Sequence, residues 1–342
     1  MRYLKGLWVC LLLPAVGIAH HSFAEFDQQR TIEIAGTLRD VAWENPHVKL
    51  KVQTIEAGKT VVWDVECHSV GVLSRSNVSL AALKVGDKVK VAGNPSRATP
   101  ARMFGTNLLT ASGRELVIAP NVKQRWNAEA TAFAIRPPVP TEQPPTKGLF
   151  KVWGSDPTDP ETSPRALWRG KMDLTAAAQR ALAAWDPVHD RMLKGCDPKG
   201  MPTIMEQPYG MQFEDRGSVI LLRLEEYDTI RTIHLSDGSQ PPETRILLGY
   251  SVGHWEGETL VVTTTNISWP YITEGVRQGP ASRLEERFTV TADGTRLTDK
   301  LTITDPTTFT KPAVLKRAWV WRASERVKPY HCGTRQKIAN GT

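Results

Sequence analysis

The sequence lacks the short motifs that would identify a chemistry. It contains no nucleophile elbow, phosphate-binding loop, dinucleotide-binding glycine pattern or zinc-protease helix. It also lacks a basic stripe with interleaved aromatic residues, and its formal charge of +7 is spread along 342 residues, so nucleic acid is not expected as a partner. Beyond the first residues no apolar run is long enough to span a membrane, so no integral membrane segment is expected after processing.

The start of the chain has the pattern of a secretory signal peptide. Arg2 and Lys5 precede an apolar run that ends in Gly17-Ile18-Ala19, whose small residues suit cleavage after Ala19. Residues 1–19 are therefore set aside as a signal peptide. The predicted location of the processed protein is a bacterial periplasm.

Cysteine is scarce, with four residues in the whole chain, of which three remain after the predicted cleavage. In an oxidising compartment two of these three are expected to pair. Cys196 and Cys332 lie in the first and last segments of the second half, and we predict a disulfide between them. Cys67 is then left over and is expected to be a small buried hydrophobic residue.

The abundant signal is β structure, which predicts a mainly β protein of two domains with one short helix. Residues 20–118 show three strands, a short helical segment and two further strands, the order of a small OB-like barrel. Residues 119–168 are proline-rich and are expected to form a linker. Residues 169–337 combine one helix, Leu174–Trp185, with about eight antiparallel strands. This predicts a lipocalin-like antiparallel barrel, with a β-sandwich as the alternative.

Several segments of the first domain carry a family resemblance. They are His20-His21-Ser22-Phe23-Ala24-Glu25-Phe26-Asp27, Gly36-Thr37, Trp43-Glu44-Asn45-Pro46-His47 and Leu83-Lys84-Val85-Gly86-Asp87. In these segments residues 20–118 resemble DUF6152, a family of exported bacterial proteins of unknown function. The second half resembles an uncharacterised exported bacterial β-domain, notably around Gly253–Leu260 and Asp305-Pro306. The resemblance implies export and does not imply a reaction.

Two groups of residues in the second half are candidates for a site. Glu256, Glu258 and Asp305 could supply an acid and a base for a hydrolase or isomerase, although acidic residues at turns are commonly solvated or bonded to their own backbone. The other group contains Trp255 and three residues that alternate along one strand and so share a face: Arg317, Trp319 and Trp321. That face is either a barrel wall or a lining for an anionic or aromatic ligand.

Together these patterns predict an exported binding protein with a small-molecule ligand in the second barrel. The alternative is a carboxylate-dependent hydrolase or isomerase acting in that barrel. The sequence does not indicate an oligomeric state.

The mature N-terminus is a candidate copper site. Cleavage after Ala19 would place a free amine on His20, beside the imidazole of His21. Both groups deprotonate at modest cost near neutral pH, and His47 could add a third nitrogen ligand. Nitrogen ligands of this kind favour Cu(II) among the divalent metals.

Overall fold

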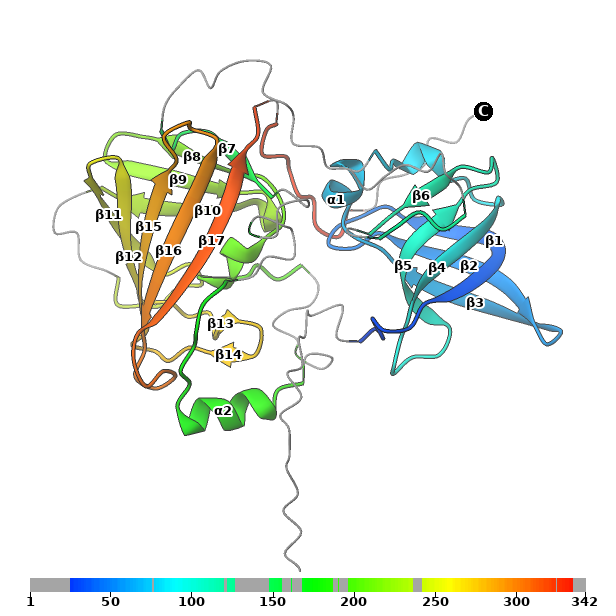
Figure 1. The fold of residues 1–342 in the computed structure, drawn as a ribbon, viewed down its shortest axis with the longest axis horizontal. Helices are drawn as coiled ribbons and strands as arrows, with labels where there is room; N and C mark the ends of the chain where they lie inside the picture. Colours follow the sequence, from blue (N-terminus) through cyan, green and yellow to red (C-terminus); the bar gives the residue numbers. More distant parts are fainter. Residues whose placement is uncertain are drawn as a thin grey trace, which may run out of the picture.

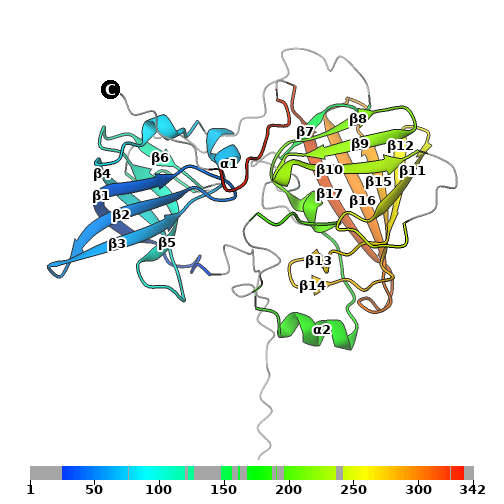
Figure 2. The same ribbon diagram turned by 180° about the vertical axis from the view of Figure 1, so that it is seen from behind.

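The computed structural model describes residues 25–75, 77–119, 122–126, 148–155, 161, 168–186, 190, 196–235, 242–323 and 325–334. The predicted signal peptide lies outside these residues. The described chain folds into two β-barrels that lie side by side (Figures 1 and 2). The mainly β class is thereby confirmed, and the second domain is a barrel and not a sandwich. In the described ranges no helix has the length and apolar character needed to cross a membrane.

The first barrel follows the OB-like order predicted from the sequence. Its elements are β1 (Ile32–Ala42), β2 (Lys49–Glu56), β3 (Lys59–Glu66), α1 (Val70–Arg75), η1 (Leu80–Ala82), β4 (Lys88–Pro95), β5 (Arg102–Leu109) and β6 (Glu115–Val117). Strand β1 pairs antiparallel with both β2 and β4, and β3 pairs in parallel with β5. The ring β1-β2-β3-β5-β4 is therefore closed.

Side-chain alternation explains how these strands form a core. In β4, Val89 and Val91 are buried while Lys88 is exposed, as a strand with one covered face requires. Gly93 lies where the β4–β5 register shifts. A Cβ at this position would be 2.3 Å from the carbonyl oxygen of Phe104, so only glycine allows the two backbones to approach this closely.

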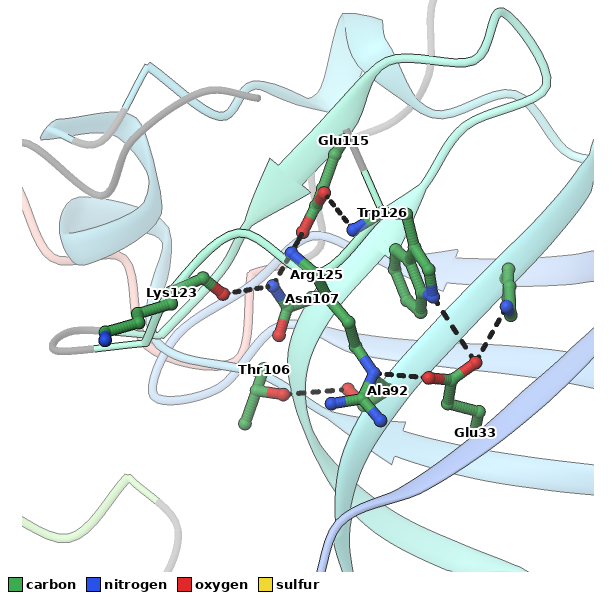
Figure 3. A network of polar contacts seen from close by, with 9 residues as sticks. Glu33, Ala92, Thr106, Asn107, Glu115, Lys123, Arg125 and Trp126 are labelled. Atoms are coloured by element: carbon green, nitrogen blue, oxygen red, sulfur yellow. Dashed lines mark hydrogen bonds and ion pairs between the residues drawn. The ribbon is translucent and has the colours of Figure 1, made fainter. Parts of the chain in front are cut away.

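Residues 122–126, at the start of the predicted linker, are fixed to the first barrel (Figure 3). The buried Glu115 carboxylate accepts hydrogen bonds from the backbone N–H groups of Arg125 at 2.7 Å and Trp126 at 2.8 Å. Glu33 pairs with the Arg125 guanidinium and accepts a hydrogen bond from the Trp126 indole at 3.3 Å. This part of the linker therefore belongs structurally to the first domain.

The second barrel has nine strands, one more than the sequence indicated. The strands are β7 (Val152–Gly154), β8 (Met211–Asp215), β9 (Val219–Leu224), β10 (Thr229–His234), β11 (Tyr250–Glu256), β12 (Thr259–Thr265), β15 (Arg283–Val290), β16 (Arg296–Thr304) and β17 (Ala313–Trp321). The extra strand, β7, comes from the range expected to be a linker. All neighbouring strands are antiparallel except β10 and β11, which are parallel.

Among the described residues, five smaller elements of the second domain lie outside the nine strands of its barrel. They are η3 (Thr203–Glu206), η4 (Glu226–Asp228), β13 (Tyr271–Thr273), β14 (Val276–Arg277) and α2 (Ala176–Ala183). The predicted helix is confirmed in α2, where the Thr175 hydroxyl caps the N-terminus by accepting from the Ala178 N–H at 3.1 Å. Strands β11 and β12 form a hairpin, with Gly257 at φ +60° in its turn.

The last described segment of the chain connects the two barrels, and Figure 1 shows it in red crossing from one to the other. Asn45, in the first barrel, donates to the Tyr330 carbonyl at 2.5 Å and accepts from the Val70 N–H at 3.0 Å. The Asn45 carbonyl accepts from the Gly333 N–H at 2.9 Å. The Trp-Glu-Asn-Pro-His segment noted in the sequence is therefore a docking point for the C-terminal segment.

Candidate ligand-binding site

Strand β17 directs three of the four predicted ligand-binding residues into the second barrel. Arg317, Trp319 and Trp321 are all buried, because alternate residues of a strand share one face. Trp255 does not join them. Its side chain is 40% exposed on β11 and makes an edge contact with Phe150, with ring centroids 6.2 Å apart.

The Arg317 guanidinium lies over the Trp319 ring, 5.4 Å from its centroid. Its Nη2 donates to the carbonyl oxygens of Glu206 at 3.2 Å and Gln207 at 3.4 Å. Among the described residues its Nε and Nη1 have no hydrogen-bond partner, and neither has the Trp319 indole nitrogen. Burial lowers the pKa of Arg317 to about 10, so the side chain remains a cation at neutral pH.

The carboxyl group that interacts electrostatically with Arg317 is that of Glu206, in η3. It accepts hydrogen bonds from the Trp168 N–H at 3.1 Å and the Thr273 hydroxyl at 2.8 Å. Burial raises the pKa of Glu206, which favours its uncharged form. Glu206 still supports the Arg317 cation electrostatically, but among the described residues no carboxylate is in ion-pair contact with it.

A second arginine in the barrel is fully engaged. Arg231 Nε donates to Ser251 at 3.0 Å, Nη1 to Glu286 at 3.0 Å, and Nη2 to Thr264 at 2.7 Å as well as to the other Glu286 oxygen. Arg231 and Glu286 are 1% and 0% exposed, so this bidentate ion pair lies wholly inside the barrel. We call these four residues the Arg231 cluster.

Asp299 lies beside the Arg231 cluster and differs from it in being incompletely bonded. Its Oδ1 accepts from the Arg287 N–H at 3.2 Å, while its Oδ2 has no partner among the described residues. Burial and the neighbouring charge of Glu286 raise the pKa of Asp299 well above its ordinary value. Asp299 is also the register partner of Arg317 across β16 and β17.

Arg231, Glu286 and Asp299 were not among the predicted site residues, although the sequence carries a signal for them. Glu286 stands two residues from both Leu284 and Phe288, so the strand alternation places it on the apolar, inward face. Asp299 is flanked in the same way on β16. Charged residues at inward positions of a strand are the pattern that would have found them.

The predicted catalytic carboxylates have structural contacts. Glu256 pairs with Arg287 at 2.5 Å and with His254 at 3.2 Å, and the Arg287 hydrogen bond lowers the pKa of Glu256. Glu258 is exposed in the hairpin turn. The hairpin tip therefore has the character of a solvated surface turn.

Asp305 is buried and closes a loop. It accepts hydrogen bonds from the Gly279 N–H at 2.6 Å and from the Thr307 N–H at 3.0 Å and hydroxyl at 2.6 Å. Burial alone would raise the pKa of Asp305, but these hydrogen bonds hold it below its ordinary value. Both of its oxygens are thus occupied by the backbone and side chain of neighbouring loops.

The predicted copper ligands are only partly within the described structure. His20 and His21 lie outside it. His47 lies in the first barrel, where its Nδ1 is 3.0 Å from the Cys67 carbonyl oxygen and 3.7 Å from Glu66. Because a carbonyl oxygen can only accept, Nδ1 carries a proton and the lone pair of the neutral ring is on Nε2. The described residues contain no group of three or more metal-ligating side chains.

The predicted disulfide is present. Cys196 and Cys332 are joined with a Cα–Cα distance of 5.6 Å. Cys67 is a free, buried cysteine, and burial raises the pKa of its thiol. A buried thiol of raised pKa is an inert core residue, in agreement with the sequence analysis.

Part of the first barrel is similar to a known family. Residues 9–104 match the model of a family of unknown function, DUF6152. The match covers most of the first barrel and includes His47 and Asn45, but it does not reach the second barrel. Neither the curated proteins nor the solved structures gave a match.

Proposed function

We propose that the protein is an exported binding protein that holds a small molecule inside its second barrel. The observation that supports this proposal is the set of buried, unpartnered donors around Arg317 and Trp319. A buried polar group without a partner costs about 1–3 kcal/mol, and more if it is charged, so buried groups are normally paired. A bound molecule would supply the missing acceptors.

Native mass spectrometry of the exported, processed protein tests this proposal. We expect a species heavier than the disulfide-bonded polypeptide, with an excess mass that denaturing conditions release as a small molecule. A native mass equal to that of the polypeptide alone, together with the absence of any small molecule in the denatured sample, would contradict the proposal.

An enzymatic function, hydrolase or isomerase, is the weaker alternative. Such a reaction needs an acid and a base facing the same substrate. Glu286 and Asp299 are both inside the barrel, but both oxygens of Glu286 are held by Arg231. Only Asp299 has an oxygen without a partner. One acidic group beside an unneutralised arginine is better suited to holding a ligand than to moving protons on and off it.

A second binding function, for copper at the mature N-terminus, is favoured by the contacts of Glu25. Glu25 pairs with Arg102 Nε at 2.9 Å, and Arg102 Nη2 pairs with Glu66 at 2.7 Å, beside His47. Since one extended residue spans about 3.3 Å, His20 is within about 17 Å of Glu25 along the chain. The Nδ1 hydrogen bond of His47 to a backbone carbonyl is also the usual support for a metal-binding imidazole.

Calorimetry with Cu(II) on correctly processed protein tests the copper site. We expect about 10- to 100-fold weaker binding for His47→Ala, and a similar loss when one extra residue precedes His20, because the free amine is then displaced. His254→Ala is the matched control, since this histidine is exposed on the second barrel. Equal affinities in all four proteins would mean that the binding is adventitious.

A further inference from the structure

The chemistry of the unpartnered atoms in the second barrel points to one class of ligand, and this inference rests on the proposed binding function. Arg317 Nε and Nη1 and Trp319 Nε1 can only donate hydrogen bonds. The Arg317 and Trp319 side chains are buried, at 4% and 0% exposure. A ligand that satisfies them must therefore present several acceptor oxygens toward β17.

The charge of Arg317 further limits the class of ligand. Among the described residues the Arg317 cation has only two backbone carbonyls as hydrogen-bond partners and no carboxylate in ion-pair contact. The other buried arginine, Arg231, is already neutralised by Glu286. Buried charges in proteins are paired, because an isolated one is strongly disfavoured. The ligand should accordingly be an anion.

The position of Asp299 on β16 makes it a candidate for a second contact with the ligand. Asp299 and Arg317 are directly opposite one another on β16 and β17, and both side chains are buried on the inner face of the barrel. Directly opposed residues have Cβ atoms about 4.5–5.5 Å apart, so the two side chains start from adjacent positions on the inner wall. Asp299 Oδ2 has no partner, and burial next to Glu286 favours the protonated acid, which can donate from that oxygen.

We propose that Arg317 and Asp299 together bind the carboxylate of a small organic acid inside the second barrel, with the Trp319 indole as a third donor. One carboxylate oxygen accepts from the Arg317 guanidinium, and the other accepts from the Asp299 hydroxyl. The remainder of the acid lies against the Trp319 ring. No covalent step is involved.

The test is titration calorimetry and thermal unfolding of the processed, disulfide-bonded protein with acetate, propionate, succinate and benzoate. Propionamide serves as the neutral analogue, and inorganic phosphate as an oxyanion without carbon. We expect at least one carboxylate at saturating concentration to raise Tm by about 5 °C. The amide should have no effect. Binding of phosphate in place of every carboxylate would overturn the assignment of a carboxylate.

Single substitutions test how much each residue contributes to carboxylate binding. Arg317→Met should weaken carboxylate binding about 100-fold while leaving Tm of the free protein unchanged or higher, because the substitution removes an unpaired buried charge. Trp319→Phe keeps the ring and loses the N–H, so we expect about 10-fold weaker binding. Asp299→Asn retains a donor and should stay within a few-fold of the parent. Arg283→Met, an arginine on the outer face of the barrel, should bind as the parent does.

The outcomes also distinguish this inference from the broader proposal. A co-purifying molecule that lacks a carboxylate, or carboxylate binding that survives Arg317→Met and Trp319→Phe, would overturn the inference while leaving a binding protein. A protein that carries no molecule after export and binds none of the probes would overturn both. A co-purifying organic acid that is lost from Arg317→Met would support both.

Discussion

Replacing Glu286 with leucine should lower the free energy of unfolding by about 3–5 kcal/mol, because it leaves the buried Arg231 cation without its counter-charge. The leucine itself suits the inner face, between Val262 and Leu301 on the neighbouring strands. The loss would therefore reflect the orphaned charge and not poor packing. Urea denaturation followed by tryptophan fluorescence measures it.

The double variant Arg231→Met/Glu286→Leu is the control for this prediction. Removing both charges should restore most of the lost stability, since apolar replacements of a buried ion pair are commonly neutral or stabilising. Glu285→Leu, one residue away on the outer face, should change stability by less than about 0.5 kcal/mol. If Glu286→Leu were as mild as Glu285→Leu, the Arg231 cluster would have no role in holding the barrel together.

Removing the disulfide with Cys196→Ser/Cys332→Ser should cost about 5 kcal/mol, the chain-entropy value for a bridge between residues 136 apart. The loss should appear as a lower Tm in the absence of reductant. Adding reductant should bring the parent down toward the variant.

Two further proteins make the disulfide result specific. Each single serine variant should lose as much stability as the double variant, because half a bridge closes no loop. Cys67→Ala, which changes the free buried thiol in the first barrel, should cost only about 1 kcal/mol. Alkylation of both Cys196 and Cys332 in unreduced protein would show that no bridge forms.

Much of the fold could be predicted from local patterns. The sequence predicted the strand order of the first barrel, about eight strands in the second, and a helix over the range that contains α2. Strand β7 could not be found this way. It has three residues in a proline-rich range, and it is a strand only because β17 and β8 provide partners on either side.

The candidate site was predictable in part. The shared face of Arg317, Trp319 and Trp321 followed from their spacing, and the structure places all three inside the barrel. The sequence could not show that Asp299 lies opposite Arg317, because register is fixed by the whole pairing of β16 with β17. Acidic residues at turns were chosen as candidates instead, although turns are where acidic side chains most often bond to the backbone.

The wall of the second barrel is uneven. Strands β15, β16 and β17 are joined by long ladders, whereas the pairs β10–β11, β17–β7 and β7–β8 are each joined at only two residue positions. Short ladders have few hydrogen bonds to break, so they separate at a lower free energy than the rest. The barrel is thus two stiff arcs joined by weak seams. We expect the amide hydrogens at these seams to exchange with solvent faster than those of β15, β16 and β17, which hydrogen exchange would measure.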